Sequence, residues 1–538
     1  MHRLILLLSL LLASPWTSAA CPAVDTVPLA ELRAGALAEG ERVTVEGVVS
    51  ATFFAEGQLG GFYLQQDDQR PTGLFVYAPQ MGEHELRPGS QIQLSARFAR
   101  FHDRPQLTHP QQLRHCGDVG LPTPYPLQLP RDHRKLEQLA GVKVRFSQTL
   151  TVSGNYELAR YGSLTLAANG RLWRDDAPKE SKARRIELDD GSYRANPRPI
   201  PYLSEEGTRR SGSRVEDLTG ILTHAFDAWR IHPTREPRFV EANPRPAPLP
   251  PPGEALRIAT FNVENYFLTL GQRGAGSRAE LQRQRDKLRA VVNGLDADIL
   301  ALVEVENRPE ALADLLRQLN AGRAAEQQYH AVSHPYRGSD AIKVALLYRP
   351  ARVESLAAAA DRDTVHSRAP LLAWFRPQAG GAPFGVVAVH FKAKVGCPRS
   401  GDIDRGEGCW NRLRSEQAKR LTAWISQQRR EDWPVIVAGD LNAYPNEQPL
   451  QRFAEAGKGD LLGTWELPRR SYSYVFRAQA GQLDYLLGDE GILPRLGNSG
   501  IWHINADEPP FLAYDAAAPS DGPWRSSDHD PVWIELRH

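Results

Sequence analysis

Hydrophobic and polar positions change their spacing along the chain. In residues 43–113 short apolar runs alternate with polar positions, most clearly at 43–49 and 91–98, and glycines separate the runs. A period of two is typical of strands that bury one face, and glycine turns at short spacing join such strands. The pattern therefore predicts a small β-rich domain, a barrel or a sandwich, over residues 21–120.

We expect this first domain to be an OB-like barrel, a class that often binds nucleic acid and serves equally well as a structural spacer. A second β-rich domain is expected over residues 121–242, with strands at 142–146 and 163–166. Residues 243–253 are rich in proline, which favours an extended, semi-rigid linker.

After the linker the pattern changes to buried strands that alternate with amphipathic helices. Apolar runs at 257–263 and 435–438 are typical of buried strands. Ser277 followed by Glu280 resembles a capping box, and apolar residues at helical spacing follow it. Strands and helices in alternation predict one large α/β domain over residues 254–538.

The N-terminus has the composition of an export signal. An apolar run at residues 4–13 follows a short positive start, and small residues at 18–20 offer a cleavage site. We therefore expect a secreted protein, extracellular or periplasmic, with a lipoprotein anchored at Cys21 as the second interpretation. No later stretch approaches the ~20 apolar residues that a membrane helix needs, so we expect no membrane span.

Overall composition excludes some functions. The 538 residues include 65 Lys and Arg against 64 Asp and Glu, a formal net charge of +1. A protein that coats nucleic acid through its global charge is therefore excluded, and an anionic substrate has to be bound by a local site. The apolar fraction of 41% and the charged fraction of 24% are those of globular proteins.

Four cysteines suit an oxidising compartment. Cys397 and Cys409 flank a glycine-rich stretch, and we expect them to close a loop. Cys21 would then pair with Cys116. Four cysteines allow three connectivities, so the other two stay open. The chain lacks the CxxC spacing of a zinc site.

Polar side chains occur where the expected strands begin or end. The positions are Asn262, Glu264, Glu304, Glu306, His390, Lys392, Asp440, Asn442, Asp484 and residues 528–530. One such position is usually the start of a loop, but six groups in one domain indicate a common site. Carboxylates suit hard cations, and imidazoles suit acid–base chemistry on a phosphate.

These positions carry a resemblance to a known family. The segments are FNVEN at 261–265, VEVEN at 303–307, VHFK at 389–392, GDLNA at 439–443, LDY at 483–485 and SDHDP at 527–531. In this order they resemble the motifs of the endonuclease/exonuclease/phosphatase superfamily, whose deoxyribonuclease I-like fold is a four-layer α/β/β/α sandwich. GSDAIKV at 338–344, YSYVF at 472–476 and residues 148–162 are similar to secreted bacterial extracellular nucleases.

The resemblance implies a divalent-metal site. Glu304 would be the main ligand, and Glu264 and Asp528 would complete or share the coordination. The family commonly has Asp where this chain has Glu264. The expected ion is Mg²⁺, with Mn²⁺ or Ca²⁺ as alternatives, while Asn262 and Asn442 would hold the phosphate oxygens and the attacking water.

The resemblance also implies the acid–base groups. Asp440 would orient or deprotonate the water, and His529, held by Asp484, would stabilise the phosphorane or move a proton. His390 resembles the second catalytic histidine, and Asp340 is our candidate to orient it. Lys343 and Lys392 are candidates for phosphate contacts.

Three functions remain as hypotheses. The first is a secreted, metal-dependent nuclease, expected to be monomeric, that hydrolyses DNA and also RNA by in-line attack of water. The second is a phospholipid phosphodiesterase or an inositol-phosphate phosphatase of the same fold. The third is a non-catalytic binding protein with a decayed enzyme domain, and the intact motif set argues against it. Because every motif follows the linker, we expect removal of the residues before 254 to leave the chemical groups intact.

The cysteine pairing gives a first testable prediction. A bridge between Cys397 and Cys409 is expected to stabilise its loop by roughly 2–4 kcal/mol, because it limits the freedom of the unfolded chain. Reduction should therefore lower the melting temperature, and peptide mass mapping of the oxidised protein should find the two cysteines linked. Two free thiols at these positions would contradict the pairing.

Overall fold

The computed structural model describes residues 21, 23–35, 37–67, 70–82, 86–430, 432–463 and 470–537. The expected signal peptide, residues 1–20, lies outside them. The chain forms two compact units. The first comprises the chain up to Thr149 with Ile186–Pro197 and Glu216–Arg238, and the second comprises Leu150–Arg185, Arg198–Val215 and Phe239–His538. The domain boundaries expected from the sequence stay a prediction.

A closed barrel forms the start of the first unit. Helix α1 (Leu29–Ala34) precedes the strands β1 (Arg42–Phe53), β2 (Gly61–Gln66), β3 (Thr72–Tyr77), β4 (Ser90–Phe101) and β5 (Arg104–Asp118). The barrel closes in the order β1-β2-β3-β5-β4 around an apolar core that includes Val45, Phe62 and Leu94. The alternating pattern thus predicted the barrel correctly, and its likeness to an OB fold stays a prediction.

The rest of the first unit is a set of paired strands in the order β11-β14-β13-β7-β6. Their bounds, with those of one 3-10 helix, are β6 (Tyr125–Pro126), η1 (His133–Lys135), β7 (Lys143–Phe146), β11 (Arg185–Asp189), β13 (Leu218–Ala225) and β14 (Ala228–Pro233).

The second unit begins before the proline-rich segment. Its first elements are β8 (Leu150–Gly154), α2 (Leu158–Tyr161), β9 (Ser163–Ala168), β10 (Leu172–Trp173) and α3 (Pro178–Arg184). The short strands β12 (Arg214–Glu216) and β15 (Arg238–Val240) lie where the chain changes units. Strand β8 pairs antiparallel with β9 and with β12. A separate sheet has the order β10-β26-β25, with β25 at Tyr474–Phe476 and β26 at Gln479–Gly481.

Two six-stranded sheets form the centre of this unit. The first has the order β18 (His330–Ala331), β19 (Ile342–Tyr348), β17 (Ile299–Glu306), β16 (Leu256–Tyr266), β29 (Val532–Leu536), β28 (Leu496–Ile501). The second has the order β20 (Val353–Ala360), β21 (Leu371–Pro377), β22 (Phe384–His390), β23 (Val435–Asp440), β27 (Asp484–Asp489), β24 (Lys458–Asp460).

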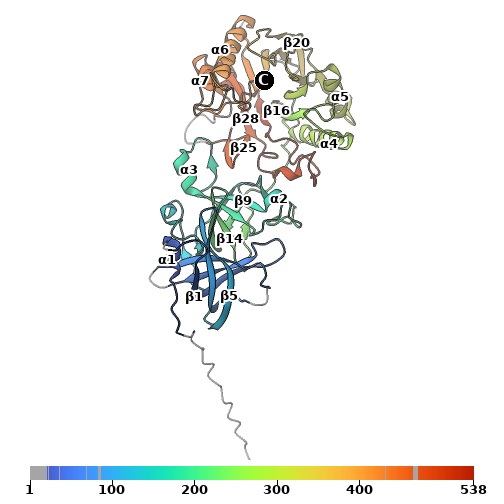
Figure 1. Cartoon of the computed structure of the whole chain (residues 1–538). Helices are drawn as coiled ribbons and strands as arrows, with labels where there is room; N and C mark the ends of the chain where they lie inside the picture. Colours follow the sequence, from blue (N-terminus) through green and yellow to red (C-terminus); the bar gives the residue numbers. More distant parts are fainter. Residues whose placement is uncertain are drawn as a thin grey trace, which may run out of the picture. The chain divides into compact units, whose positions relative to one another are not determined.

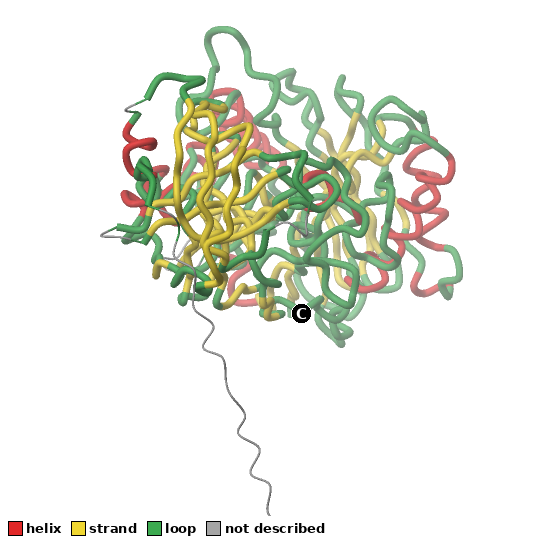
Figure 2. The backbone as a smooth tube through the Cα atoms, turned by 60° about the horizontal axis from the view of Figure 1, so that its bottom comes forward, coloured by secondary structure: helices red, strands yellow, loops and turns green. Residues whose placement is uncertain are grey.

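Helices cover the outer faces of these sheets. Helices α4 (Arg278–Leu295) and α5 (Pro309–Asn320) lie on one side, and α6 (Asn411–Gln428) and α7 (Gln448–Glu455) lie on the other (Figure 1). The 3-10 helices are η2 (Ala325–Gln327), η3 (Glu490–Arg495) and η4 (Pro510–Leu512). Strands and loops make up most of the backbone (Figure 2).

Side-chain burial shows four layers. Ile258 of β16 packs in the cluster between the sheets, with Val386 of β22, while the next residue, Ala259, packs against Leu288 of α4. On the second sheet Val387 packs against α6 and α7 in the same way. Alternate residues of a strand point to opposite faces, so each sheet buries both faces. The predicted α/β/β/α sandwich is confirmed.

Local signals predicted from the sequence also hold. The Ser277 hydroxyl accepts a hydrogen bond from the amide of Glu280 at 3.2 Å, as an N-cap of α4 does. Disulfides join Cys21 to Cys116 and Cys397 to Cys409, which are the expected pairs. Among the described residues, no helix is both long and apolar enough to cross a membrane.

The layered core predicts which leucines matter for stability. Leu346 of β19 is fully buried between the sheets, whereas Leu493 is 52% exposed. We expect Leu346→Ala to cost about 2–5 kcal/mol because it leaves a cavity. Leu493→Ala should stay within about 0.5 kcal/mol of wild type. Thermal unfolding of both variants measures the difference, and equal melting temperatures would contradict the packing.

Candidate active site

The ends of two pairs of parallel strands build the site. β16 runs parallel to β17 in the first sheet, and β22 runs parallel to β23 in the second. Parallel strands bring their carboxyl ends to the same edge of a sheet. Asn262 and Glu304 therefore meet at an edge of the first sheet, and His390 and Asp440 meet at an edge of the second. The register pairs His390 directly with Asp440.

Irregular backbone turns three of the side chains toward this region. The pairing of β16 with β17 shifts register between Asn262 and Tyr266, and that of β17 with β19 shifts between Leu302 and Val305. Inside these irregularities lie Glu264, with φ of 50°, and Glu304, with φ of 68°. Asn442 also has a positive φ, 47°. Non-glycine residues in this conformation cost about 1–3 kcal/mol each and cluster at functional sites.

Gly439 is required where the strands meet. Its φ is 152°, and a Cβ there would lie 1.9 Å from the carbonyl oxygen of Val389. The GDLNA motif therefore needs glycine so that β23 can approach β22 closely beside Asp440.

An amide group joins the two sheets at the centre of the site. The Nδ2 atom of Asn262 donates to Glu304 Oε1 at 3.1 Å and to Asp440 Oδ2 at 3.3 Å. Nε2 of His390 lies 3.9 Å from the same Glu304 oxygen and 3.6 Å from the same Asp440 oxygen. Four predicted residues from two sheets therefore surround one point.

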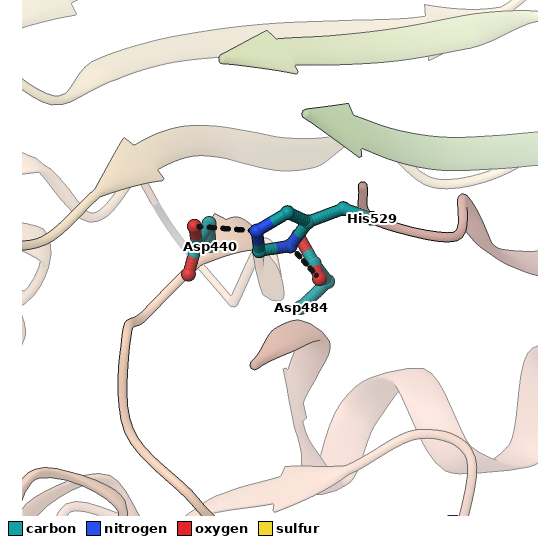
Figure 3. A group of neighbouring side chains, drawn as sticks. All are labelled: Asp440, Asp484 and His529. Atoms are coloured by element: carbon teal, nitrogen blue, oxygen red, sulfur yellow. Dashed lines mark hydrogen bonds and ion pairs between the residues drawn. The ribbon is translucent and has the colours of Figure 1, made fainter. Parts of the chain in front are cut away.

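His529 and Asp484 form a hydrogen-bonded pair. Nδ1 of His529 lies 2.7 Å from Asp484 Oδ2, and Nε2 lies 3.9 Å from Asp440 Oδ2 (Figure 3). Burial alone would lower the pKa of His529, but the carboxylates of Asp484, Asp528 and Asp440 outweigh it and raise that pKa well above its usual value. The surrounding carboxylates therefore favour the charged form of His529, and its Nε2 faces Asp440.

Asp440 has a raised pKa at the centre of the site. Burial, with the nearby Asp484 carboxylate, raises its pKa to about 7, against the opposing effect of His529. The amide of Asn442 donates to its Oδ1 at 2.7 Å, which fixes the carboxylate. A carboxylate whose pKa lies near neutrality is suited to accept a proton from water.

Three further carboxylates, Glu264, Glu304 and Asp528, lie near one another, and we call them the carboxylate cluster. Burial and the Asp528 charge raise the pKa of Glu304 and raise that of Glu264 well above its usual value. Oε2 of Glu264 is buried and makes no hydrogen bond to any described residue. Hard cations are held by carboxylate oxygens, and a cation would remove this repulsion.

Among the described residues, the acidic group whose ligand atoms all lie within 4.8 Å of one another is a different one, Asp440, Asp484 and His529. The hydrogen bond to Asp484 occupies Nδ1 of His529, which leaves Nε2 as the ring atom nearest to Asp440.

His390 is a buried, neutral imidazole in this site. Burial, with the charge of Arg368, lowers its pKa well below the usual value, and its Nδ1 makes no hydrogen bond to any described residue. Asp340, our candidate to orient it, instead accepts a hydrogen bond from Arg368 Nε at 3.1 Å and lies 3.6 Å from Arg273. The structure therefore does not bring Asp340 and His390 together.

Each of the two lysines contacts another part of the protein, and their role in phosphate binding stays a prediction. Lys343 is 3% exposed, and its Nζ donates to the carbonyl of Arg308 at 2.7 Å. Lys392 lies over the ring of Trp410, 5.3 Å from its centroid. Asn442 reaches the site through its backbone amide, while its side chain donates to the carbonyl of Phe391 at 3.2 Å.

Two neighbours of the His529–Asp484 pair were not given this place by the sequence analysis. The Ser473 hydroxyl donates to Asp484 Oδ2 at 2.6 Å, and the Tyr474 ring stacks on His529 with centroids 4.6 Å apart. Both lie in the YSYVF segment; the sequence offers Tyr474 for stacking on bases or for packing, and nothing in it marks Ser473. A serine and a tyrosine beside a strand carry no separate signal of such a role.

Residues 259–529, about half of the chain, match the profile of the Endonuclease/Exonuclease/phosphatase family. The chain belongs to this family. Its members are hydrolases that act on phosphoester bonds. No curated protein matches the chain.

Several solved structures of the endonuclease/exonuclease/phosphatase fold are similar to the chain. The human Nocturnin catalytic domain with bound sulfate is 20% identical to the chain. The match covers 52% of this chain and 94% of the Nocturnin chain, with a TM-score of 0.36. D. rerio TDP2 complexed with a single-strand DNA product is 17% identical, with 53% and 99% coverage and a TM-score of 0.35. A Bacteroides thetaiotaomicron mannosyl-6-phosphatase is 16% identical, with 53% and 100% coverage and a TM-score of 0.34.

The hydrogen-bonded pair gives a prediction about phosphoester hydrolysis. We expect His529→Ala and Asp484→Asn each to lower kcat by about 100-fold or more, because each change removes a positioned acid–base group. His330, an exposed residue of β18, supplies the control His330→Ala. Initial rates on chromogenic phosphate esters measure the loss. Wild-type rates in both site variants would contradict this assignment.

Proposed function

We propose that the protein is a secreted, metal-dependent nuclease that hydrolyses phosphodiester bonds of extracellular DNA, with RNA as a further substrate. The observation that carries the proposal is the arrangement around Asn262. One carboxylate suited to take a proton, Asp440, and one imidazolium suited to give one, His529, flank a common point beside a carboxylate cluster. Hydrolysis of a diester needs these groups, because water must lose a proton and the leaving alkoxide must gain one.

Glu304, Glu264 and Asp528 are the residues that would hold the metal, for which Mg²⁺ is our first choice and Mn²⁺ or Ca²⁺ the alternatives. When bound, a divalent cation there acts as a Lewis acid toward a phosphate oxygen. The raised pKa values of the two glutamates support a cation at this place.

The protein's own residues would divide the remaining work. Asp440 accepts the proton of the attacking water, and the Asn262 amide, shared between Glu304 and Asp440, keeps that carboxylate in place. Nε2 of His529 donates to the charged oxygens or to the leaving oxygen, while Asp484 fixes its ring through Nδ1. Neutral His390 adds a polar contact from the second sheet. Fixed donors of this kind stabilise the charge that develops in the transition state.

Secretion is supported by the two disulfides, because such bonds persist in oxidising compartments. The N-terminal pattern of the sequence points the same way.

A digestion experiment tests the function. We expect the purified protein to cut circular and linear DNA only with a divalent cation, because the carboxylate cluster needs one. Chelation should abolish cutting, and Mg²⁺, Mn²⁺ or Ca²⁺ should restore it. Glu304→Gln should lose about 100-fold or more in rate. The matched control is Glu310→Gln, since the Glu310 side chain is 62% exposed.

Full activity in excess chelator would contradict metal dependence. Faster hydrolysis of sphingomyelin or an inositol phosphate than of DNA would contradict the nuclease and favour the second hypothesis of the same fold.

A further inference from the structure

His529 is held by a loop that sequence reasoning left without a role. We call residues 503–508 the support loop. Asn505 Nδ2 donates to the carbonyl of His529 itself at 2.7 Å. The next residue, Asp530, accepts from the amides of Asn505 and Ala506 at 2.7 and 3.0 Å, and His503 Nδ1 lies 2.8 Å from its other oxygen. The position of His529 therefore depends on that of the support loop.

Arginines from before the proline-rich segment hold the support loop. Nη1 of Arg171 lies 2.6 Å from Asp507 Oδ1, and Arg210 donates to Glu508 and to the carbonyl of His503. Both acids have 0% exposure. Burial would raise the pKa of Asp507, but Arg171 and Arg210 lower it to about 2, so the pair stays charged.

Tyr472 connects Arg171 to the support loop by a second contact. Its hydroxyl donates to Asp507 Oδ2 at 2.8 Å, its ring stacks on His503 at 4.1 Å, and Arg171 lies over that ring at 4.6 Å. Gly212, beside this guanidinium, has φ of 96°, a backbone conformation that favours glycine. Arg171 therefore contacts both the carboxylate of Asp507 and the ring of Tyr472.

The ring that stacks on His529 is also supported by residues from before the proline-rich segment. Tyr474, whose ring stacks on His529, lies in β25, and β25 pairs with β26, which pairs in parallel with β10. The Ser153 hydroxyl donates to the carbonyl of Ala478 at 2.7 Å, in the turn that joins β25 to β26. Residues 150–185 therefore complete the sheet that carries Tyr474.

We infer that Arg171 is a positioning residue that orients His529 through the support loop, and that residues 150–185 thereby take part in catalysis. The inference rests on the proposed function for the identity of the reaction. It differs from an ordinary stabilising contact because both supports of one catalytic side chain come from this segment. It also changes our sequence-based expectation that the residues before 254 can be removed without harm to the chemical groups.

The test compares Arg171→Ala with Arg209→Ala in the full-length protein. Arg209 is a matched control: it also precedes the proline-rich segment and is buried, but its side chain pairs with Glu241 and contacts Phe239 instead of the support loop. We expect Arg171→Ala to lower kcat on a chromogenic phosphodiester at least about tenfold with KM unchanged. Arg209→Ala should keep the wild-type kcat.

Hydrogen exchange gives a readout that needs no substrate. We expect amide exchange in the peptide covering residues 526–530 to be about tenfold faster in Arg171→Ala and unchanged in Arg209→Ala, because only the first change releases the support loop. Wild-type exchange there in Arg171→Ala, or wild-type kcat despite faster exchange, would overturn the inference. If Arg171→Ala does not fold, Arg171→Lys against Arg209→Lys makes the same comparison.

The two proposals can fail separately. A wild-type protein that cuts no phosphodiester would contradict the proposed function. The hydrogen-exchange comparison alone would then decide whether Arg171 positions His529.

Discussion

Burial of carboxylates is the constraint on which the rest of this structure depends. Asp484, Asp507 and Glu508 are fully buried and Asp440 is nearly so. A buried charge without a partner costs several kcal/mol, so each of these groups needs a cation or fixed donors close by. The fold supplies them in two ways, with imidazoles and amides at the sheet edges and with arginines from before the proline-rich segment.

The two kinds of buried acid differ in how fully they are satisfied. Asp507 receives hydrogen bonds from Arg171, Tyr472 and Asn243, and Glu508 receives them from Thr208, Arg210 and Arg245. In the candidate site, by contrast, Oε2 of Glu264 and Oδ1 of Asp484 make no hydrogen bond to any described residue. Carboxylates whose oxygens are all hydrogen-bonded stabilise the scaffold. Carboxylates with an oxygen that lacks a partner can still bind a metal, water or substrate.

The four layers were expected from the family resemblance, and most of the central residues from the positions where buried strands end. Asn262, Glu304, His390 and Asp440 could be expected to converge, since parallel strands end at one edge. The bulges that turn Glu264 and Glu304 could not be expected, because the chain uses glutamate, not glycine, at positive φ. Asp340 and Lys343 were placed by resemblance alone, and their partners, Arg368 and the Arg308 carbonyl, come from loops without a sequence signal.

The contacts of Arg171 that support His529 are the feature that the sequence could predict least. Arg171 and Asp507 are 336 positions apart, and a single arginine in a polar loop looks like any solvated charge. Proline-rich composition indicates a boundary in the chain, but it carries no information about which surfaces pack across that boundary. Burial is more informative than composition here. Two carboxylates with no exposed surface must have partners, and the segment that supplies those partners belongs to the enzyme. By that criterion the functional unit begins at β8, in the same place where the compact unit begins.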